Sequence, residues 1–157
     1  MTKEERKAYY KQHYQENKED ISVQKKQRYQ ENKEDINKNR RHRRATDPNF
    51  KIAGVLRSRI KDAIKNQSAI KSGKTLELLG CTIQKAREHL ESQFTEGMGW
   101  ENHSFYGWHI DHIRPCASFG LTDPEQQKLC FHYTNLQPLW AEDNLSKSDK
   151  LDWRKQP

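Results

Sequence analysis

The sequence predicts an α+β protein that is mostly helical, with two short strands near its C-terminus. Residues 1–44 are polar and rich in helix formers, and from residue 50 apolar residues recur at helical spacing. Two stretches after residue 107 have the character of short strands. We therefore expect a basic arm over 1–48, helical or partly disordered, a helical segment over 49–98, and a small unit of strands and helices over 99–157.

The amino-acid composition limits the size of the hydrophobic core and the class of molecule that the protein can bind. Apolar residues make up only 32% of the chain, so we expect a small core with part of the chain outside it. The formal net charge of +7 favours a polyanionic partner, and a generic basic surface is the alternative. No apolar run is long enough to span a membrane and the N-terminus is charged, so we expect a soluble, cytoplasmic protein.

The arm contains an internal repeat, because the octapeptide YQENKEDI at 14–21 recurs at 29–36. It has no Pro or Gly, and its apolar positions are too sparse for a core, so helices without a buried face are expected. A cluster of cations with no acid between them then follows: Lys38, Arg40, Arg41, Arg43 and Arg44. Such a cluster can bind phosphates without sequence choice, and the alternative is a solvated helix whose charges only keep it soluble.

A break at residues 46–49 separates the arm from an amphipathic stretch. Its apolar residues follow one helical stripe: Ile52, Ala53, Leu56, Ile60, Ala63 and Ile64. Arg57, Arg59 and Lys61 fall away from this stripe, where they can face nucleic acid. Gly80 is expected to end a short helix. Residue Thr82 is expected to cap a following helix that continues to about Gly97.

Two stretches in the last third of the chain belong together. The first, WHIDHIRP at 108–115, is a β-like run that brings an Asp-His pair to a turn. The second, at 134–147, is expected to be a strand that breaks at Pro138 and continues as a short helix. Asp123 and Pro124 suit the start of a helix that bridges the two strands and ends near His132. All four tryptophans lie in this region, where we expect them to supply the core.

The paired stretches carry the groups that phosphodiester hydrolysis requires. A neutral histidine near pH 7 can take a proton from water, which suits His112 for a general base. Asp111 is a hard oxygen ligand for Mg²⁺ or Mn²⁺, and Asn144 offers a second oxygen from the helix. In a regular strand Asp111 and His112 point to opposite faces, so both reach one site only if the strand twists or ends there, and Pro115 favours an ending.

The combination of Asp-His-Ile-x-Pro at 111–115, Asn-Leu-Gln-Pro-Leu-Trp at 135–140 and an Asn on the following helix resembles the HNH family of nucleases over about 99–150. The site of that family is a ββα-metal finger, in which two strands and a helix surround one divalent cation. Further segments resemble the phage-type HNH endonucleases: ELLGC at 77–81, ESQF at 91–94 and GMGWEN at 97–102.

The resemblance implies a role for several residues. His112 matches the general base, and Asp111 and Asn144 match the metal ligands. Asn135 matches the family's middle Asn, which holds the loop that carries the base. His109 has no fixed role in the family. Its strand position places it on the face of Asp111, which suits an auxiliary role: it can contact phosphate or a metal-bound water, or only orient Asp111.

Other cations are candidates for contacts with the substrate. Arg114 follows the base and can clamp the scissile phosphate, or it is an ordinary surface charge. Lys147 lies one turn beyond Asn144 on the same helix face, and with Arg57 and the arm cations we expect it to bind nucleic acid.

As a whole, the resemblance implies a metal-dependent endonuclease or nickase that cuts double-stranded DNA and leaves 5′-phosphate and 3′-hydroxyl ends. It implies one divalent cation, with Mg²⁺ first and Mn²⁺ or another divalent ion as alternatives. If the gene is phage-encoded, the implied location is the host-cell cytoplasm. Two other hypotheses stay open: a non-catalytic nucleic-acid-binding protein that keeps the HNH fold, and an HNH nuclease that acts on RNA.

The remaining histidines and the cysteines are expected to be structural. Cys81, Cys116 and Cys130 are interpreted as reduced and mostly buried, and the absence of a CxxC pair argues against a Cys-rich structural zinc knuckle. His89 and His132 are interpreted as packing or surface residues.

Overall fold

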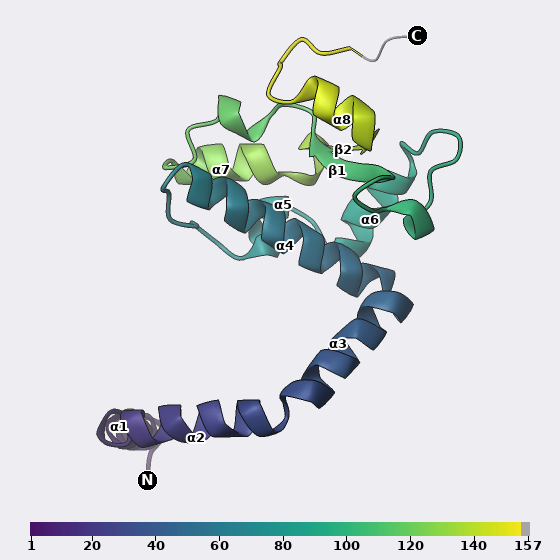
Figure 1. Cartoon of the computed structure of the whole chain (residues 1–157). Coiled ribbons are helices and arrows are strands. Elements are labelled where there is room, and N and C mark those ends of the chain that lie inside the picture. The colour runs from purple at the N-terminus through teal and green to yellow at the C-terminus, as the bar shows by residue number, and fades with distance from the viewer. Residues whose placement is uncertain (155–157) are drawn as a thin grey trace. The chain divides into compact units, whose positions relative to one another are not determined.

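The computed structural model describes residues 1–154, so the last three residues of the segment expected over 99–157 lie outside the described part. The chain forms two compact units, residues 1–46 and the part from Asp47 onward, and Figure 1 follows its elements in order. It is mostly helical with one small antiparallel sheet, so the α+β class is confirmed. No helix within residues 1–154 is long and apolar enough to cross a membrane.

The first unit consists of three helices, α1 (Lys3–Glu16), α2 (Lys18–Glu31) and α3 (Lys33–Thr46). The sequence repeat corresponds to this division. Each break falls at an asparagine whose Nδ2 donates to a carbonyl oxygen of the preceding helix, Asn17 to His13 and Asn32 to Arg28, both at 2.8 Å. None of these helices buries a residue. They therefore depend on local interactions such as the capping box between Thr2 and Glu5 rather than on a core.

The second unit has five α-helices, three 3₁₀ turns and two strands within the described residues. In chain order they are α4 (Pro48–Asn66), α5 (Thr75–Leu79), α6 (Ile83–Glu91), η1 (Trp100–Asn102), β1 (Trp108–His112), η2 (Cys116–Ser118), α7 (Pro124–Phe131), η3 (Tyr133–Asn135), β2 (Leu136–Trp140) and α8 (Ala141–Lys147). Three predicted boundaries are confirmed. Gly80 ends α5 in the left-handed conformation at φ 67°. The side chains of Thr82 and Asp123 cap α6 and α7.

The sheet pairs β1 with β2 antiparallel, so that Asp111 lies opposite Gln137 and His112 opposite Leu136. Helix α8 packs on both strands, and α6 packs on β2. Because side chains alternate along a strand, His112 shares its face with Trp108 and Ile110, which belong to the core. Asp111 lies on the opposite face, toward α8, as its ion pair with that helix shows.

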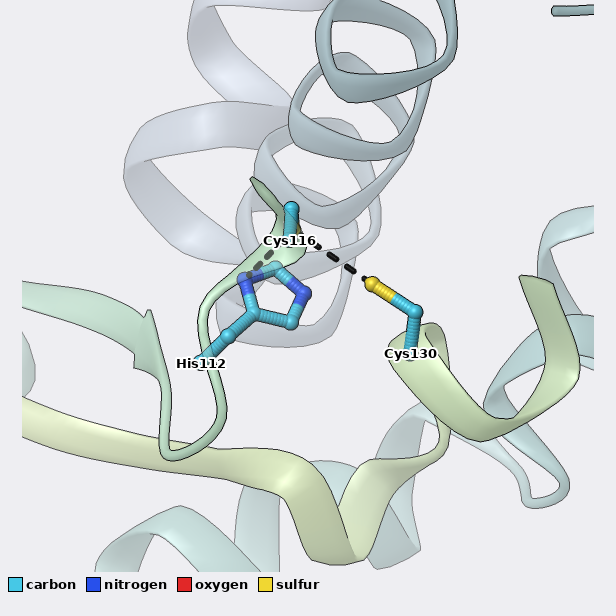
Figure 2. A group of neighbouring side chains, drawn as sticks. All are labelled: His112, Cys116 and Cys130. Atoms are coloured by element: carbon cyan, nitrogen blue, oxygen red, sulfur yellow. Dashed lines mark hydrogen bonds between the residues drawn. The ribbon is translucent and has the colours of Figure 1, made fainter. Parts of the chain in front are cut away.

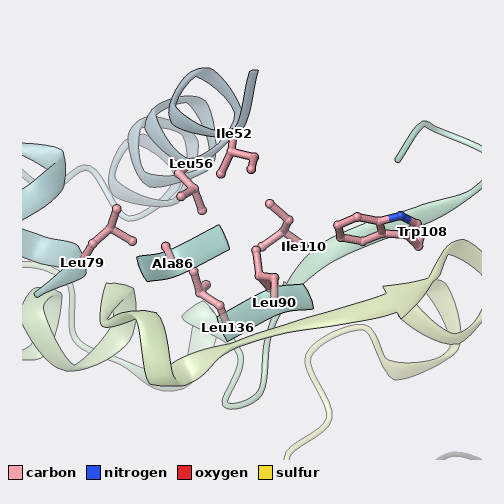
Figure 3. Close-up of a cluster of buried hydrophobic side chains, with 8 residues drawn as sticks. All are labelled: Ile52, Leu56, Leu79, Ala86, Leu90, Trp108, Ile110 and Leu136. Carbon is pink, nitrogen blue, oxygen red and sulfur yellow. The ribbon is translucent and has the colours of Figure 1, made fainter. Parts of the chain in front are cut away.

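The core holds the sheet against the helices that precede it. Figure 3 shows side chains of α4 and α6 meeting those of both strands. Its buried members are Ile52, Leu56, Leu79, Ala86, Leu90, Trp108, Ile110 and Leu136. A second cluster joins α4, α5 and α7, and its members include Ile60, Ile64, Leu78 and Phe131. This packing fixes where β1 ends, and the candidate site begins there.

Two sequence predictions about element boundaries are wrong. Strand β2 does not break at Pro138 but continues to Trp140. In a two-stranded sheet both strands are edges, so a proline without an N–H can be accommodated. Helix α6 ends at Glu91 rather than near Gly97. There the Ser92 and Gln93 side chains donate to the carbonyl oxygen of His89, which a longer helix would need as a backbone acceptor.

Candidate active site

A cavity of about 380 Å³ lies at the end of β1. Its lining residues are Arg59, Asp111, His112, Pro115, Cys116, Ala117, Asn144, Ser148 and Asp149. Asp111 and His112 leave the strand toward opposite faces, but β1 ends at His112 and both residues line this space. Asn144 reaches the same cavity from α8. The cavity therefore brings together a carboxylate, an imidazole and an amide from two separate stretches of the chain.

Asp111 is buried and its orientation is fixed by two donors. Lys147 Nζ lies 3.1 Å from Asp111 Oδ2, and both residues of this ion pair are almost fully buried. Gln137 Nε2, from the opposing strand, donates to the same oxygen at 2.9 Å. Lys147 also donates to the carbonyl oxygen of His112 at 2.8 Å, so one ammonium joins α8 to the end of β1. Both donors bind Oδ2, and the carboxylate keeps a second oxygen for another partner.

His109 orients Asn144. The carbonyl oxygen of Phe105 lies 3.1 Å from His109 Nε2, and because a carbonyl only accepts, Nε2 carries the proton. Nδ1 is then the acceptor for Asn144 Nδ2, at 2.9 Å. With its amide nitrogen engaged in this way, Asn144 has its amide oxygen available as a ligand. His109 thus acts on Asn144, whereas its strand position alone suggested an effect on Asp111.

Asn135 holds the loop that follows His112. Its Oδ1 accepts from the backbone N–H of Arg114 at 2.9 Å, and its Nδ2 donates to the carbonyl oxygens of Arg114 and Cys130 at 3.1 and 2.8 Å. Its own carbonyl oxygen accepts from the N–H of Ile113 at 2.8 Å. One side chain therefore ties the turn after β1 to the end of α7, and it keeps His112 in place without lining the cavity.

His112 contacts a pair of cysteines. Figure 2 shows His112, Cys116 and Cys130 converging from β1, the following turn and α7. Cys116 Sγ lies 3.4 Å from His112 Nδ1, and the thiol of Cys130 donates to Cys116 Sγ at 3.5 Å. This hydrogen bond lowers the pKa of Cys116 to about 5 against the opposing effect of burial, and His112 and the charge of Arg59 act in the same direction as the bond. It also raises the pKa of Cys130.

Arg59 of α4 also lines the site. It lines the cavity of Asp111 and also an adjoining cavity of about 580 Å³, which His112, Cys116 and Ala117 share. Its Nε is buried and has no hydrogen-bond partner among the described residues. Sequence reasoning named Arg59 only as one of three polar-face cations, because helical spacing does not show which of them borders a cavity.

Three other predicted cations of the second unit do not line this space. Arg114 donates to Ser118 through Nε and Nη2, both at 3.0 Å, and its guanidinium lies 4.1 Å from the centre of the Phe119 ring. It lines neither cavity. Arg57 is exposed on α4 and also lines neither. Lys147 was expected to bind nucleic acid, but it is buried and its ammonium is engaged by Asp111.

The donor set of the cavity suits a hard divalent cation. Asp111 and Asn144 offer a carboxylate and an amide oxygen, the ligand types that Mg²⁺ and Mn²⁺ prefer, and Mg²⁺ usually keeps several waters in addition. Lys147 offsets the negative charge of Asp111, so we expect the free protein to bind the cation weakly. A phosphate in the cavity would add the missing negative charge.

Comparisons with known proteins identify relatives without an assigned activity. No family model matches the chain, and no solved structure matches it. Two proteins of Acanthamoeba polyphaga mimivirus, the uncharacterized proteins L426 and L246, are 43% and 40% identical to it over 111 residues. The matched part is 71% of this chain and 48% and 47% of the two viral proteins. The chain therefore spans about half the length of the curated relatives that it matches.

Proposed function

We propose that the unit from Asp47 onward is a metal-dependent nuclease of the HNH type that hydrolyses phosphodiester bonds in double-stranded DNA. One observation carries the proposal: Asp111, His112 and Asn144 line one cavity, although they come from two separate stretches of the chain. The elements around them are two antiparallel strands followed directly by a helix. Two strands and a helix around the site are what the sequence resemblance implies, so this arrangement supports the proposal.

Each residue has a distinct role in the proposed reaction. His112 is the general base, which takes a proton from the attacking water through an imidazole nitrogen. Asp111 and Asn144 hold one divalent cation, Mg²⁺ or Mn²⁺. When bound, the cation supplies positive charge to the phosphate as negative charge builds up and the 3′ oxygen departs. Lys147 and His109 are positioning residues, because they act through Asp111 and Asn144.

Arg59 is placed to bind the phosphate that is cut. It is a positive charge that lines the same cavity as His112, where it can bind a phosphate oxygen. We expect Arg59→Gln to lower the cleavage rate by about 10- to 100-fold, the effect of losing a hydrogen bond between charged groups. The matched control is Lys65→Gln, which removes an exposed charge that lines neither cavity from the same helix and should have little effect. Equal effects of the two variants on the single-turnover rate would contradict this role.

The three helices of the first unit are proposed to bind DNA without sequence choice. Their cations include the uninterrupted cluster at the end of α3, all of it exposed. Deleting residues 1–44 should weaken DNA binding and leave residual cutting. The slope of log affinity against log salt concentration should become shallower by about one for each phosphate that the arm neutralises. Within the full chain, Arg40→Gln with Arg41→Gln should flatten the slope more than Lys25→Gln with Lys26→Gln in α2. Unchanged affinity and slope in the truncated protein would rule out a DNA-contacting arm.

Digestion of supercoiled plasmid tests the proposed function itself. With Mg²⁺ or Mn²⁺ the protein should convert the plasmid to nicked or linear DNA, and removal of the cation with EDTA should stop the reaction. Parallel digestion of a structured RNA separates a DNA nuclease from an RNA nuclease. Duplex binding without cleavage under any divalent cation would instead support a non-catalytic nucleic-acid-binding protein.

A further inference from the structure

His112, Cys116 and Cys130 form a cluster of side chains. The proposed nuclease reaction uses His112 but gives no role to the two cysteines. A general base needs a partner that orients its ring, and a backbone carbonyl or a carboxylate usually serves. Here the partner is a thiol that is itself hydrogen-bonded to a second thiol. One donor atom from each of the three residues lies within 4.8 Å of both others. Imidazole and thiolates together are ligands that Zn²⁺ favours, whereas Mg²⁺ favours oxygen.

The distances suit tetrahedral coordination. With Zn–S bonds of about 2.3 Å and Zn–N bonds of about 2.0 Å, neighbouring donors around Zn²⁺ lie about 3.5–3.8 Å apart. In the cluster the sulfur–sulfur distance is 3.5 Å and the distance from Cys116 Sγ to His112 Nδ1 is 3.4 Å. Two of the three donor pairs therefore lie close to the spacing that one cation requires, and the third pair lies within 4.8 Å.

The surrounding contacts fix these donors in place. Asn135 bonds the loop after His112 and the carbonyl oxygen of Cys130 at the same time. Gln67 of α4 donates to the carbonyl oxygen of Cys116 at 3.1 Å. Cys130 is fully buried. A ligand set held by its own scaffold in this way loses little freedom when an ion binds.

The three residues of the cluster differ in their access to the cavities of the site. Cys130 is closed off by the protein, whereas His112 and Cys116 both line the two cavities of the site. A cation held by the three residues would therefore have its fourth position facing the cavity. Structural zinc sites usually have four protein ligands, and sites that exchange a ligand keep one position open.

We propose that His112, Cys116 and Cys130 form a binding site for one soft divalent cation, Zn²⁺, with its fourth position open to the cavity. Zn²⁺ takes the place of the proton that Cys130 shares with Cys116, so binding releases a proton to the solvent. Bound Zn²⁺ also occupies the imidazole of His112. It therefore inhibits cleavage, a consequence that rests on the proposed function, whereas the binding itself does not.

Zinc titration of the full chain tests the site directly. The protein is kept reduced with a non-thiol reductant, and Zn²⁺ alone is titrated against a chromophoric chelator, with Co²⁺ as a spectroscopic probe of thiolate coordination. Wild type should bind one Zn²⁺, and Cys116→Ser and Cys130→Ser should lose about 100-fold or more in affinity, since even changes to the groups around a metal's ligands cost up to about that much. The control Cys81→Ser removes a cysteine outside the cluster and should bind like wild type.

Several outcomes would overturn the proposal. One is that the cysteine variants bind as tightly as wild type, which would put the ion on Asp111 and Asn144. Another is that the reduced protein takes up no Zn²⁺, for example because the two thiols only form a disulfide on oxidation. If Cys130→Ser does not fold, judged by its urea midpoint, the half-buried Cys116 carries the test through Cys116→Ser and Cys116→Ala.

Inhibition of DNA cleavage by Zn²⁺ is measured in a separate experiment. The nuclease activity and the zinc site can then be refuted independently of each other. At fixed Mg²⁺, each protein is compared with its own cleavage rate without Zn²⁺. Added Zn²⁺ should stop plasmid cleavage by wild type and by Cys81→Ser, and Cys130→Ser should need about 100-fold more Zn²⁺ for the same fractional loss. A protein that binds Zn²⁺ through the cluster and cuts nothing under any condition refutes the nuclease and leaves the metal site standing. A protein that cuts with Mg²⁺ and binds no Zn²⁺ refutes the metal site alone.

Discussion

Replacing His112 with alanine should lower the single-turnover rate of DNA cleavage by about 100- to 10,000-fold, the usual contribution of a general base. His112 ends β1, lines the cavity with Asp111 and Asn144, and has no other ionisable imidazole beside it in that cavity. No second imidazole of the described lining can therefore take over its role. The measurement uses protein in excess over plasmid, so that the rate reports the chemical step and not binding.

Two comparisons make the His112 result specific. DNA affinity of the variant, measured without a divalent cation, should remain near that of wild type, because a buried residue at the end of a strand contributes little to binding. His132→Ala is the matched control, since its ring bonds Thr134 and packs on Tyr133 outside the cavity. If His112→Ala cuts as fast as wild type, the assignment of the base is wrong.

Replacing Lys147 with methionine should destabilise the second unit by about 3–5 kcal/mol, the usual cost of removing one partner from a buried ion pair. Lys147 and Asp111 are 3% and 6% exposed, and Met leaves the carboxylate in a largely dry environment without its cation. The substitution also removes the hydrogen bond to the carbonyl oxygen of His112. We therefore expect losses of stability and of activity together.

Urea unfolding followed by tryptophan fluorescence measures this effect, because Trp100, Trp108 and Trp140 all lie in the second unit. The exposed Lys150, three residues further on, provides the control, and Lys150→Met should stay within about 0.5 kcal/mol of wild type. The double variant Asp111→Asn with Lys147→Met should be more stable than the sum of its single effects predicts, since both charges are gone. Additive effects would show that the pair contributes nothing of its own.

The parts of the fold that were predictable depend on local chemistry. Gly80 can adopt a left-handed conformation, and Thr82 and Asp123 can cap a helix wherever they occur, so these boundaries followed from a few neighbouring residues. The end of α6 and the course of β2 through Pro138 depend on which backbone groups have other partners. That information exists only in the folded chain.

The site could be predicted only in part, for the same reason. Asp111, His112 and Asn144 belong to a recognisable pattern, and the structure brings them to one cavity. Lys147 follows a run of polar helix residues that usually face solvent, and only the packing of α8 on β1 shows that it is buried. Cys130 reaches His112 through the packing of α7, so no spacing in the sequence marks the three-residue cluster.

The central claim is that Asp111, His112 and Asn144 form one metal-dependent site, and the Mg²⁺ dependence of plasmid nicking by Asn144→Ala tests it most directly. Asn144 is half-buried and lines the cavity, so its loss should leave the fold intact and raise the half-saturating Mg²⁺ concentration by about 10-fold or more. Asp149→Ala changes an exposed acid of the same cavity and should behave like wild type. Nicking that needs no divalent cation, or an Asn144→Ala curve that coincides with that of wild type, would contradict the claim.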